Sequence, residues 1–367
     1  MKTSDVLIIG GGIIGCSIAL ELSRAQVRVT LLERDRVGCE ASGEAAGMLA
    51  PQAEALAPGP FLDLCLKSRE MFGPLGDLLK AETGIDIEYL CSGLLYLVFT
   101  EEDEIHAKRM LEEQRGCGLR VEWWDRRQVL KAEPHVSPEI RGALHLPDDH
   151  HVQNARMVRA QSLLAARRGV EVVEGSPVTG VVREGDRVIG VHTPTETYHG
   201  DKIVIAAGAW SGVIGEFLDR EIPIQPARGQ LLSLEMRPDL FRHILYARQA
   251  YLVPRANGEV VVGSTVEFVG FEKQVTAAGI AGLLTAAREL VPGLADRPFV
   301  RAWSGFRPWT PDELPYLGHV PGTRGLYVAS GHFRNGILLA PVTGHLMAER
   351  LLDQKPSFSL DPFGLDR

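Results

Sequence analysis

The sequence has few cysteines and none of the short motifs that carry common hydrolytic or metal chemistry. Its five cysteines, Cys16, Cys39, Cys65, Cys91 and Cys117, are odd in number and include no C-x-x-C pair. A disulfide framework and a zinc site are therefore not expected, and a reducing cytoplasm fits this usage. The chain also lacks a G-x-S-x-G elbow, a Walker lysine motif and an H-E-x-x-H pair, and its histidines form no ligand pattern, so we predict no metal.

Long apolar runs and an excess of positive charge are absent as well. No uninterrupted stretch of 18 apolar residues occurs, and three glycines interrupt the apolar N-terminal run, so we expect neither a transmembrane helix nor a signal peptide. The net charge of −8 argues against nucleic acids and anionic membranes as partners. Because no side-chain nucleophile stands out, we expect a cofactor to carry the chemistry.

Residues 6–33 follow the order strand, glycine turn, helix, strand and acid. An apolar strand at 6–9 precedes Gly10-Gly11-Gly12-Ile13-Ile14-Gly15, which fits G-x-G-x-x-G, and a second strand ends at Glu33. In a dinucleotide-binding βαβ unit, the first glycine allows the tight turn, the second lets the backbone approach a pyrophosphate, and the third lets helix and strand pack closely. The helix N-terminus attracts phosphate, and Glu33 can accept a hydrogen bond from a ribose hydroxyl. The order predicts a bound dinucleotide rather than an ordinary glycine-rich turn, and it leaves open which one.

The length of 367 residues is too great for one ordinary core, so two domains are expected. Alternating strands and helices occupy 1–84, 147–220 and 307–367, whereas strand-rich sequence fills 85–146 and 221–306. We therefore predict an α/β Rossmann-like dinucleotide-binding domain, built from the first set of segments, interleaved with a sheet-rich α+β substrate-binding domain, built from the second.

Local patterns predict individual elements. Residues 61–82 suggest a helix broken at Gly73-Pro74, and 85–89 suggest a strand. The sequence from Thr100 to Asp103 matches a capping box that opens a helix, and Ala256-Asn257-Gly258 between two alternating runs is a hairpin signal.

Three segments offer candidate site residues. His332–Leu338 follows a strand and a glycine turn and opens a helix, which suits a second anchor for a cofactor, although a purely structural turn is the alternative. Arg307 lies among aromatic and glycine residues, where an arginine can hold a carboxylate through two hydrogen bonds or form a surface salt bridge. Tyr251 could donate to a carboxylate or simply pack on a sheet. Arg228 and Arg255 are further possible carboxylate ligands.

Seven segments along the chain together resemble the flavin-dependent D-amino-acid oxidase superfamily, and most of all its bacterial glycine oxidases of thiamine biosynthesis. They read VLIIGGGIIG at 6–15, EAAGMLAPQAE at 44–54, VIAAGAWS at 204–211, ARGQ at 227–230, YLVPR at 251–255, WSGFRP at 303–308 and GHFRNGILLAP at 331–341. No one segment is decisive, but all seven in this order are specific, and they span nearly the whole chain.

The resemblance implies that the cofactor is FAD, and it implies which residues bind it. The pyrophosphate and adenosine parts would contact Gly10, Gly12, Ile13, Ile14, Gly15, Glu33, Arg34, Ala41, Ser42, Val178 and Gly208. The isoalloxazine ring would lie near Ala46, Gly47, Met48, His332, Phe333, Arg334, Asn335, Gly336, Ile337 and Leu338. Arg307 would bind the substrate carboxylate, Arg334 would be a second arginine on the substrate side, and Tyr251 would be the active-site tyrosine.

The activity implied by the resemblance is oxidative deamination of glycine and other small amines, such as sarcosine and short D-amino acids. Arg307 and Tyr251 would aim the substrate at the flavin for hydride transfer, and O2 would reoxidise the flavin to give H2O2. A role in making the thiazole of thiamine and a homotetramer are also implied. A related dehydrogenase that passes electrons to a quinone or a protein, and a non-oxidase flavin module, are the alternatives.

The chain departs from the family pattern at a few positions. Val266 stands where a methionine is expected, and Gln249 where a polar residue or histidine is expected. A proline expected after a His-Val pair is missing from His151-Val152-Gln153-Asn154. Val266 is expected to change the wall of the substrate pocket and thereby the range of substrates.

Overall fold

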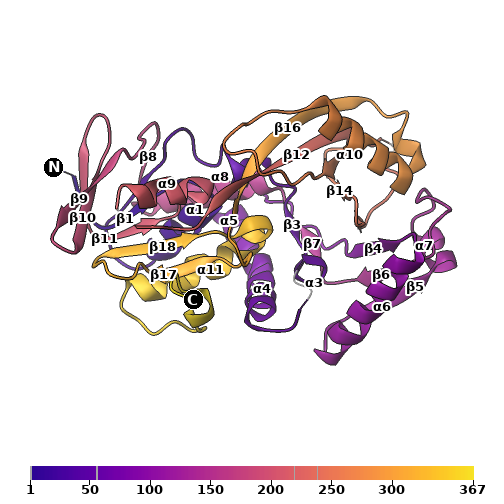
Figure 1. Ribbon diagram of the computed structural model, residues 1–367, viewed down its shortest axis with the longest axis horizontal. Coiled ribbons are helices and arrows are strands. Elements are labelled where there is room, and N and C mark those ends of the chain that lie inside the picture. Colours follow the sequence, from indigo (N-terminus) through magenta and orange to yellow (C-terminus); the bar gives the residue numbers. More distant parts are fainter. Residues whose placement is uncertain (1, 55–56, 219, 238) are drawn as a thin grey trace.

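The structure is a computed structural model that describes the whole chain except residues 1, 55–56, 219 and 238. Two eight-stranded sheets lie toward opposite ends of the molecule, and helices pack around each of them (Figure 1). A two-stranded sheet of β3 (Met48–Leu49) and β7 (His150–His151) lies between them.

The first sheet has a parallel centre and antiparallel additions. Strands β18, β11, β1, β2 and β8 are neighbours in this order and run parallel, while β17 pairs antiparallel with β18 and the hairpin β9–β10 extends from β11. The strands are β1 (Lys2–Ile9), β2 (Val29–Leu32), β8 (Glu171–Val173), β9 (Gly180–Glu184), β10 (Arg187–His192), β11 (Thr197–Ile205), β17 (Tyr316–His319) and β18 (Leu326–Ser330). The central strands are apolar on both faces because helices cover both.

Helices of the first sheet come from distant parts of the chain. They are α1 (Ile13–Leu22), α4 (Pro60–Glu70), α5 (Phe72–Thr83), α8 (Asn154–Arg167), α9 (Ser211–Glu216) and α11 (Gly336–Leu351). Helix α1 is buried along almost its whole length, between α8 and α11. Gly344 of α11 makes the close approach possible, since a Cβ there would lie 2.8 Å from the backbone of Ser17.

The parallel register brings the carboxyl ends of four strands to one edge. Ile9 at the end of β1 pairs with Leu32 at the end of β2 and with Ile205 at the end of β11, and β18 follows alongside. Loops that leave this edge of a parallel sheet form the usual binding crevice of open α/β sheets. The edge therefore places the glycine turn, Glu33 and the segment after Ser330 near one another.

The second sheet is antiparallel except for one pair. Its order is β16-β12-β15-β14-β13-β4-β6-β5, and only β13 and β4 run parallel. The strands are β4 (Leu94–Val98), β5 (Glu122–Asp125), β6 (Gly142–Leu146), β12 (Gln225–Glu235), β13 (Ile244–Tyr246), β14 (Tyr251–Pro254), β15 (Glu259–Gly263) and β16 (Phe299–Trp309). Helices α6 (Glu101–Gly116), α7 (Arg126–Ala132) and α10 (Ala277–Leu290) pack on it, and apolar side chains of β12, β14 and β15 form a core with α10.

The remaining elements are short. They are α2 (Ala41–Glu44), α3 (Pro51–Glu54) and the 3-10 helices η1 (Gly208–Trp210), η2 (Pro292–Leu294), η3 (Phe333–Asn335) and η4 (Asp361–Phe363). None of the helices in the described part of the chain combines the length and the apolar character needed to cross a bilayer.

Several local predictions are confirmed. Thr100 and Asp103 form the reciprocal hydrogen bonds of a capping box at the start of α6. Ala256-Asn257-Gly258 lies between the antiparallel strands β14 and β15. All five cysteines are free.

Two local predictions are wrong. Residues 85–89 form no strand; the segment reaches the sheets only through a bridge between Leu90 and His151, and Glu88 has a φ of 51° that breaks the extended backbone. The helix interruption falls at Met71 rather than at Gly73-Pro74. Pro74 is tolerated because it lies in the first turn of α5, where the backbone N–H groups have no partner within the helix.

Each sheet collects strands from separate stretches of the chain. The first sheet uses 2–32, 171–205 and 316–330, and the second uses 94–146 and 225–309. We propose that the two sheets with their helices correspond to the two interleaved domains expected from the sequence. The expected boundary before residue 307 lies within β16.

Candidate functional site

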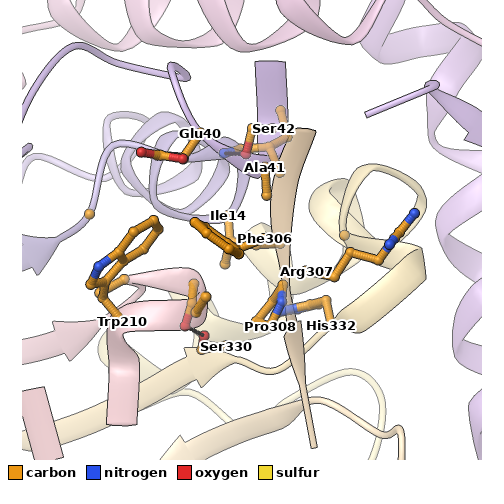
Figure 2. Close-up of a pocket in the computed structure, with 18 of the residues that line it drawn as sticks. Ile14, Glu40, Ala41, Ser42, Trp210, Phe306, Arg307, Pro308, Ser330 and His332 are labelled. Atoms are coloured by element: carbon orange, nitrogen blue, oxygen red, sulfur yellow. Dashed lines mark hydrogen bonds between the residues drawn. The ribbon is translucent and has the colours of Figure 1, made fainter. Parts of the chain in front are cut away.

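An elongated cavity of about 380 Å³ runs from the carboxyl edge of the first sheet to β12, β14 and β16 of the second. Most residues expected to bind the cofactor line it, namely Gly10, Gly12, Ile13, Ile14, Glu33, Arg34, Ala41, Ser42, Ala46, Gly47, Met48, Val178, Gly208, His332, Phe333, Arg334, Asn335, Gly336 and Ile337. Arg307 and Tyr251 line it too. In Figure 2, Glu40, Ala41 and Ser42 lie across the site from Ser330 and His332.

Two expected cofactor residues lie outside the lining. A Cβ on Gly15 would be 2.0 Å from the carbonyl oxygen of Gly10, so Gly15 has the role of close packing behind the turn. Leu338 is buried in the core beneath the cavity, where its carbonyl oxygen accepts a hydrogen bond from Ser68 at 2.6 Å.

The glycine turn between β1 and α1 presents backbone to the cavity. Gly10 has a φ of 111°, and a Cβ there would lie 2.5 Å from the carbonyl oxygen of Ala206, so only glycine fits. Gly12 caps α1 without a side-chain hydrogen bond. The hydroxyl of Ser42 accepts from the N–H of Ile13 at 2.9 Å, which fixes the small-residue loop against the helix N-terminus. The turn therefore offers helix N–H groups and a positive dipole end to an anion.

Glu33, at the end of β2, has a carboxylate fixed by backbone donors. Its two oxygens accept from the N–H groups of Gly11 at 2.7 Å and Asp35 at 2.8 Å. Each oxygen keeps a lone pair for a further donor, such as a sugar hydroxyl. Arg34 lies beside it with its guanidinium 4.3 Å from the centre of the Trp210 ring.

The loop from Ala41 to Met48 is held by two polar side chains, one buried and one half-buried. Asn154 donates its side-chain amide to the carbonyl oxygens of Ser42 at 2.7 Å and Gly43 at 2.9 Å. Arg255 donates to the carbonyl oxygens of Ala46 at 2.6 Å and Val152 at 2.7 Å. Burial lowers the pKa of Arg255 to about 10. The guanidinium of Arg255, considered above as a carboxylate ligand, is thus occupied in shaping the loop.

A second helix N-terminus faces the cavity where η3 leads into α11. Asn335 precedes the helix and makes no side-chain cap hydrogen bond. His332 is buried, its Nε2 lies 3.0 Å from the hydroxyl of Thr343, and burial lowers its pKa to about 3. The imidazole is therefore neutral near pH 7.

Arg307 and Tyr251 meet where the cavity reaches the second sheet. Arg307 donates to the hydroxyl of Ser264 at 2.5 Å and to the carbonyl oxygen of Thr265 at 3.1 Å, both of which are neutral acceptors. Burial lowers the pKa of Arg307, and the adjacent phenol of Tyr251 opposes that effect. Since an arginine side chain stays protonated in proteins, the wall of the cavity holds a desolvated positive charge without a carboxylate beside it.

Two glycines make room for this pair. A Cβ on Gly229 of β12 would lie 2.2 Å from Nη1 of Arg307, and one on Gly263 of β15 would lie 2.6 Å from the hydroxyl oxygen of Tyr251. Neither glycine stood out in the sequence, since Gly229 is only one member of the ARGQ segment. Their role depends on which side chains lie over them in the folded protein, and one amino-acid sequence does not reveal those contacts.

Arg334 has a partner that sequence reasoning missed. Its Nη2 donates to Glu54 at 2.8 Å and to the hydroxyl of Tyr246 at 2.9 Å, and its Nε lies 2.6 Å from the second carboxylate oxygen of Glu54. Burial alone would lower the pKa of Arg334, but the carboxylate of Glu54 and the phenols of Tyr246 and Tyr251 together outweigh burial, so the pKa is raised. Glu54 ends the EAAGMLAPQAE segment, and it lies 280 residues from Arg334 in the sequence.

The expectation for Val266 is wrong. Its side chain is 45% exposed and does not line the cavity, because the loop after β15 turns outward at this residue. Arg228 is likewise directed away from the cavity, toward Glu267. Among the described residues, the only group of three or more potential metal ligands whose atoms all lie within 4.8 Å of one another is Glu33, Asp35 and Cys39, and the two oxygens of Glu33 already accept from the backbone.

The donors and shape of the cavity fit FAD. Two helix N-termini without side-chain caps face it, glycines keep Cβ atoms out of it, and a fixed carboxylate lies at one end. These are the features that a dinucleotide requires. Because they come from residues 10–48 and 332–337, opposite ends of the chain would hold one cofactor.

Comparisons with known proteins agree with this arrangement. A family model described as "FAD dependent oxidoreductase" (DAO) matches residues 5–350. The chain is 35% identical to the glycine oxidase of Geobacillus kaustophilus, over 99% of this chain and 97% of that protein. It is 40% identical to the bifunctional protein ThiO/ThiG of Synechocystis, over 100% of this chain but only 54% of that protein.

A solved structure extends the similarity to the fold. The crystal structure of glycine oxidase from Geobacillus kaustophilus superposes with a TM-score of 0.97 at 35% identity, and the match covers 100% of this chain and 99% of that one. The expected fold class, a Rossmann-like α/β FAD-binding arrangement with a sheet-rich α+β part, is confirmed. The chain therefore belongs to the DAO family of FAD dependent oxidoreductases.

Proposed function

We propose that the protein catalyses the FAD-dependent oxidative deamination of glycine and other small amines, such as sarcosine and short D-amino acids. The observation that carries this proposal is the guanidinium of Arg307, which lines the cavity next to Tyr251 and bonds only to neutral oxygens of Ser264 and Thr265. A half-buried cation that makes no ion pair with the residues the structure describes is suited to an anionic ligand, and a carboxylate is the natural match for its two-pronged geometry.

In this proposal Arg307 binds the substrate carboxylate and Tyr251 donates its phenol to the same group. Gly229 and Gly263 leave the space in which the two side chains can lie flat against the sheet. FAD, when bound, supplies the acceptor for the hydride that leaves the substrate Cα. The contribution of the protein is to orient the substrate in a pocket shielded from water, which can lower a barrier by several kcal/mol without a reacting side chain (about 7–11 kcal/mol in favourable cases).

Among the cavity residues that the structure describes, none near Arg307 is a free side-chain base. Burial keeps His332 neutral and its Nε2 is beside Thr343, while Glu54 is held by Arg334. We infer that the substrate reacts with its amine neutral and that the imine product is hydrolysed by water after release. Glycine would then give glyoxylate and ammonia. Because the charge of Arg334 is paired with Glu54, Arg334 would shape the substrate side of the cavity and would not be the main ligand of the substrate carboxylate.

We propose O2 as the electron acceptor, with H2O2 as the product. The similarity to the glycine oxidase of Geobacillus kaustophilus supports an oxidase. A dehydrogenase that uses a quinone or a protein acceptor would need no change in the residues around Arg307, so the acceptor is decided by experiment.

The test uses the purified FAD-loaded protein. Anaerobic glycine should bleach the flavin absorbance, and aerobic glycine, sarcosine, D-alanine and D-proline should be compared for H2O2 production. Bleaching without peroxide would favour the dehydrogenase, and no bleaching by any of the four amines would favour a non-oxidase flavin module.

A role in making the thiazole of thiamine is the biological context that we propose. It is supported by the identity of 40% with the bifunctional protein ThiO/ThiG, of which this chain spans about half. A homo-oligomer, in particular a tetramer, remains a proposal from the family resemblance, and a cytoplasmic location remains a proposal from the cysteine usage. Light scattering on the purified protein would test the first, and fractionation of cells the second.

A further inference from the structure

The loop after β15 carries a buried hydrogen-bond network that ends at Arg307. Ser264 and Thr265, the two residues that accept hydrogen bonds from Arg307, begin this loop. Val266 and Phe268 of the same loop are exposed, although the ring of Phe268 also lies edge-on against Trp309 of β16. Polar contacts join the loop to β12.

Glu267 makes most of those contacts. One carboxylate oxygen accepts from the hydroxyl of Thr265 at 2.5 Å and from the side-chain amide of Gln230 at 2.7 Å, and the other pairs with the guanidinium of Arg228. The backbones of Glu267 and Arg228 also exchange hydrogen bonds at 2.8 and 2.9 Å. The N–H of Gln230 in turn donates to the hydroxyl of Thr265 at 2.9 Å.

Loss of the carboxylate of Glu267 would leave the guanidinium of Arg228 buried without its ion-pair partner. The residue exposure of Arg228 is 4%, and its other hydrogen bond goes to the carbonyl oxygen of Glu272 at 2.9 Å. Glu267 is the carboxylate paired with this buried guanidinium, and removal of one partner of a buried ion pair is strongly destabilising, so the pair helps to keep β12 and the loop together. Arg228 lies on β12 opposite Phe306 of β16, and Arg307 lies on β16 opposite Ala227 of β12.

We propose that Glu267 is a positioning residue for carboxylate binding, which acts on Arg307 through Thr265. The proposal rests on the proposed function, in which Arg307 receives the substrate carboxylate. Glu267 fixes the hydroxyl of Thr265. The carbonyl oxygen of Thr265, together with the hydroxyl of Ser264, in turn fixes the guanidinium of Arg307. Without the carboxylate of Glu267, the loop loses its attachment and the guanidinium its orientation.

The experiment compares Glu267→Gln with Glu272→Gln, which removes the same charge from an exposed side chain of the same loop. Acetate is titrated into the FAD-loaded protein and its binding followed by the flavin absorbance, which requires no turnover. We expect the acetate Kd and the glycine KM to rise about tenfold in Glu267→Gln and to stay unchanged in Glu272→Gln, because small displacements of an orienting group have effects of this size or larger. The flavin spectrum without acetate should be the same in all three proteins.

Thr265→Val tests the same link without disturbing Arg228. It keeps the carbonyl oxygen that Arg307 uses and removes only the hydroxyl that Glu267 and Gln230 hold, so it should weaken acetate binding in the same direction. In a double-mutant cycle, Glu267→Gln should add little to the loss caused by Arg307→Ala.

Equal acetate affinity in Glu267→Gln and Glu272→Gln, or full additivity with Arg307→Ala, would overturn the inference while leaving the proposed function intact. An unmodified protein that binds no acetate would contradict the role of Arg307 and, with it, this inference.

Discussion

Gly229 lies directly against the guanidinium of Arg307, so that a Cβ on Gly229 would be 2.2 Å from Nη1 and 2.5 Å from Nη2. Only glycine therefore leaves room in β12 for the side chain of Arg307 at the point where that side chain crosses the strand. Gly229→Ala should displace the guanidinium and lower kcat/KM for glycine roughly tenfold to a hundredfold, because the substrate is then held in the wrong place. Steady-state kinetics on the FAD-loaded variant would measure this.

Gly282→Ala is the matched control for that substitution. Gly282 lies on the exposed face of α10, and a Cβ there would meet nothing within 4 Å. The change should leave the kinetics unaltered and raise the free energy of unfolding by about 0.5–1 kcal/mol, because alanine favours a helix more than glycine does. If both variants lose the same activity, the recess at Gly229 has no special role.

Arg307→Ala should remove the main contact to the substrate carboxylate. Loss of one partner of a buried charge pair costs about 2–5 kcal/mol, which corresponds to a fall of roughly 30-fold or more in kcat/KM for glycine. Arg301→Ala on the same strand removes an exposed arginine and should change kcat/KM by less than about twofold. An unaltered glycine KM in Arg307→Ala would disprove the substrate assignment.

Arg334→Ala should have a smaller effect on glycine binding than Arg307→Ala. The charge of Arg334 is already paired with Glu54, at 2.6 and 2.8 Å, and is therefore less available to a substrate carboxylate. Comparing acetate Kd values of the two variants measures the difference. A larger increase in Kd for Arg334→Ala would instead make Arg334 the primary carboxylate ligand.

His151 should make the protein sensitive to acid. Its ring is buried with no hydrogen-bond partner, and burial lowers its pKa from 6.5 to about 3. Between these values the unfolded chain binds a proton that the native protein does not, so stability falls as the pH drops below about 6.5. His151→Leu should therefore gain stability relative to the unmodified protein by about 1.4 kcal/mol per pH unit in this range, or about 2 kcal/mol at pH 5.

Urea denaturation at pH 7 and pH 5 checks this expectation. His135→Leu, which removes a histidine at an exposed position, serves as the control. A difference between His151→Leu and the unmodified protein that does not grow toward pH 5 would refute the acid sensitivity of His151.

The sequence predicted the fold best where local signals and tertiary contacts agree. The glycine turn, the capping box at Thr100 and the turn at Asn257 are all specified by neighbouring residues. The prediction failed at 85–89, where Ile85, Ile87 and Tyr89 alternate like a strand but no neighbouring strand is present to pair with them. It also missed β16, because exposed, half-buried and buried residues follow one another in blocks along this edge strand and do not alternate.

The candidate site shows the same limit. Segments such as 10–14 and 332–337 were identified because each is a short continuous stretch of chain that lines the cavity. Glu54 and Gly229 were missed because their roles depend on Arg334 and Arg307, which are far away in the sequence. Val266 was misassigned for the converse reason, since its place next to an active-site segment did not reveal that its side chain points to solvent.

The packing of α1 on α11 has a consequence for the timing of cofactor capture. The βαβ unit with Gly10 and Glu33 leaves the ribosome before the segment at 332–337, and N-terminal parts of a chain tend to fold first. The segment at 332–337 completes the cavity. A nascent chain can therefore display one half of the nucleotide cradle early, but it can enclose the flavin only once residues 332–337 have been made.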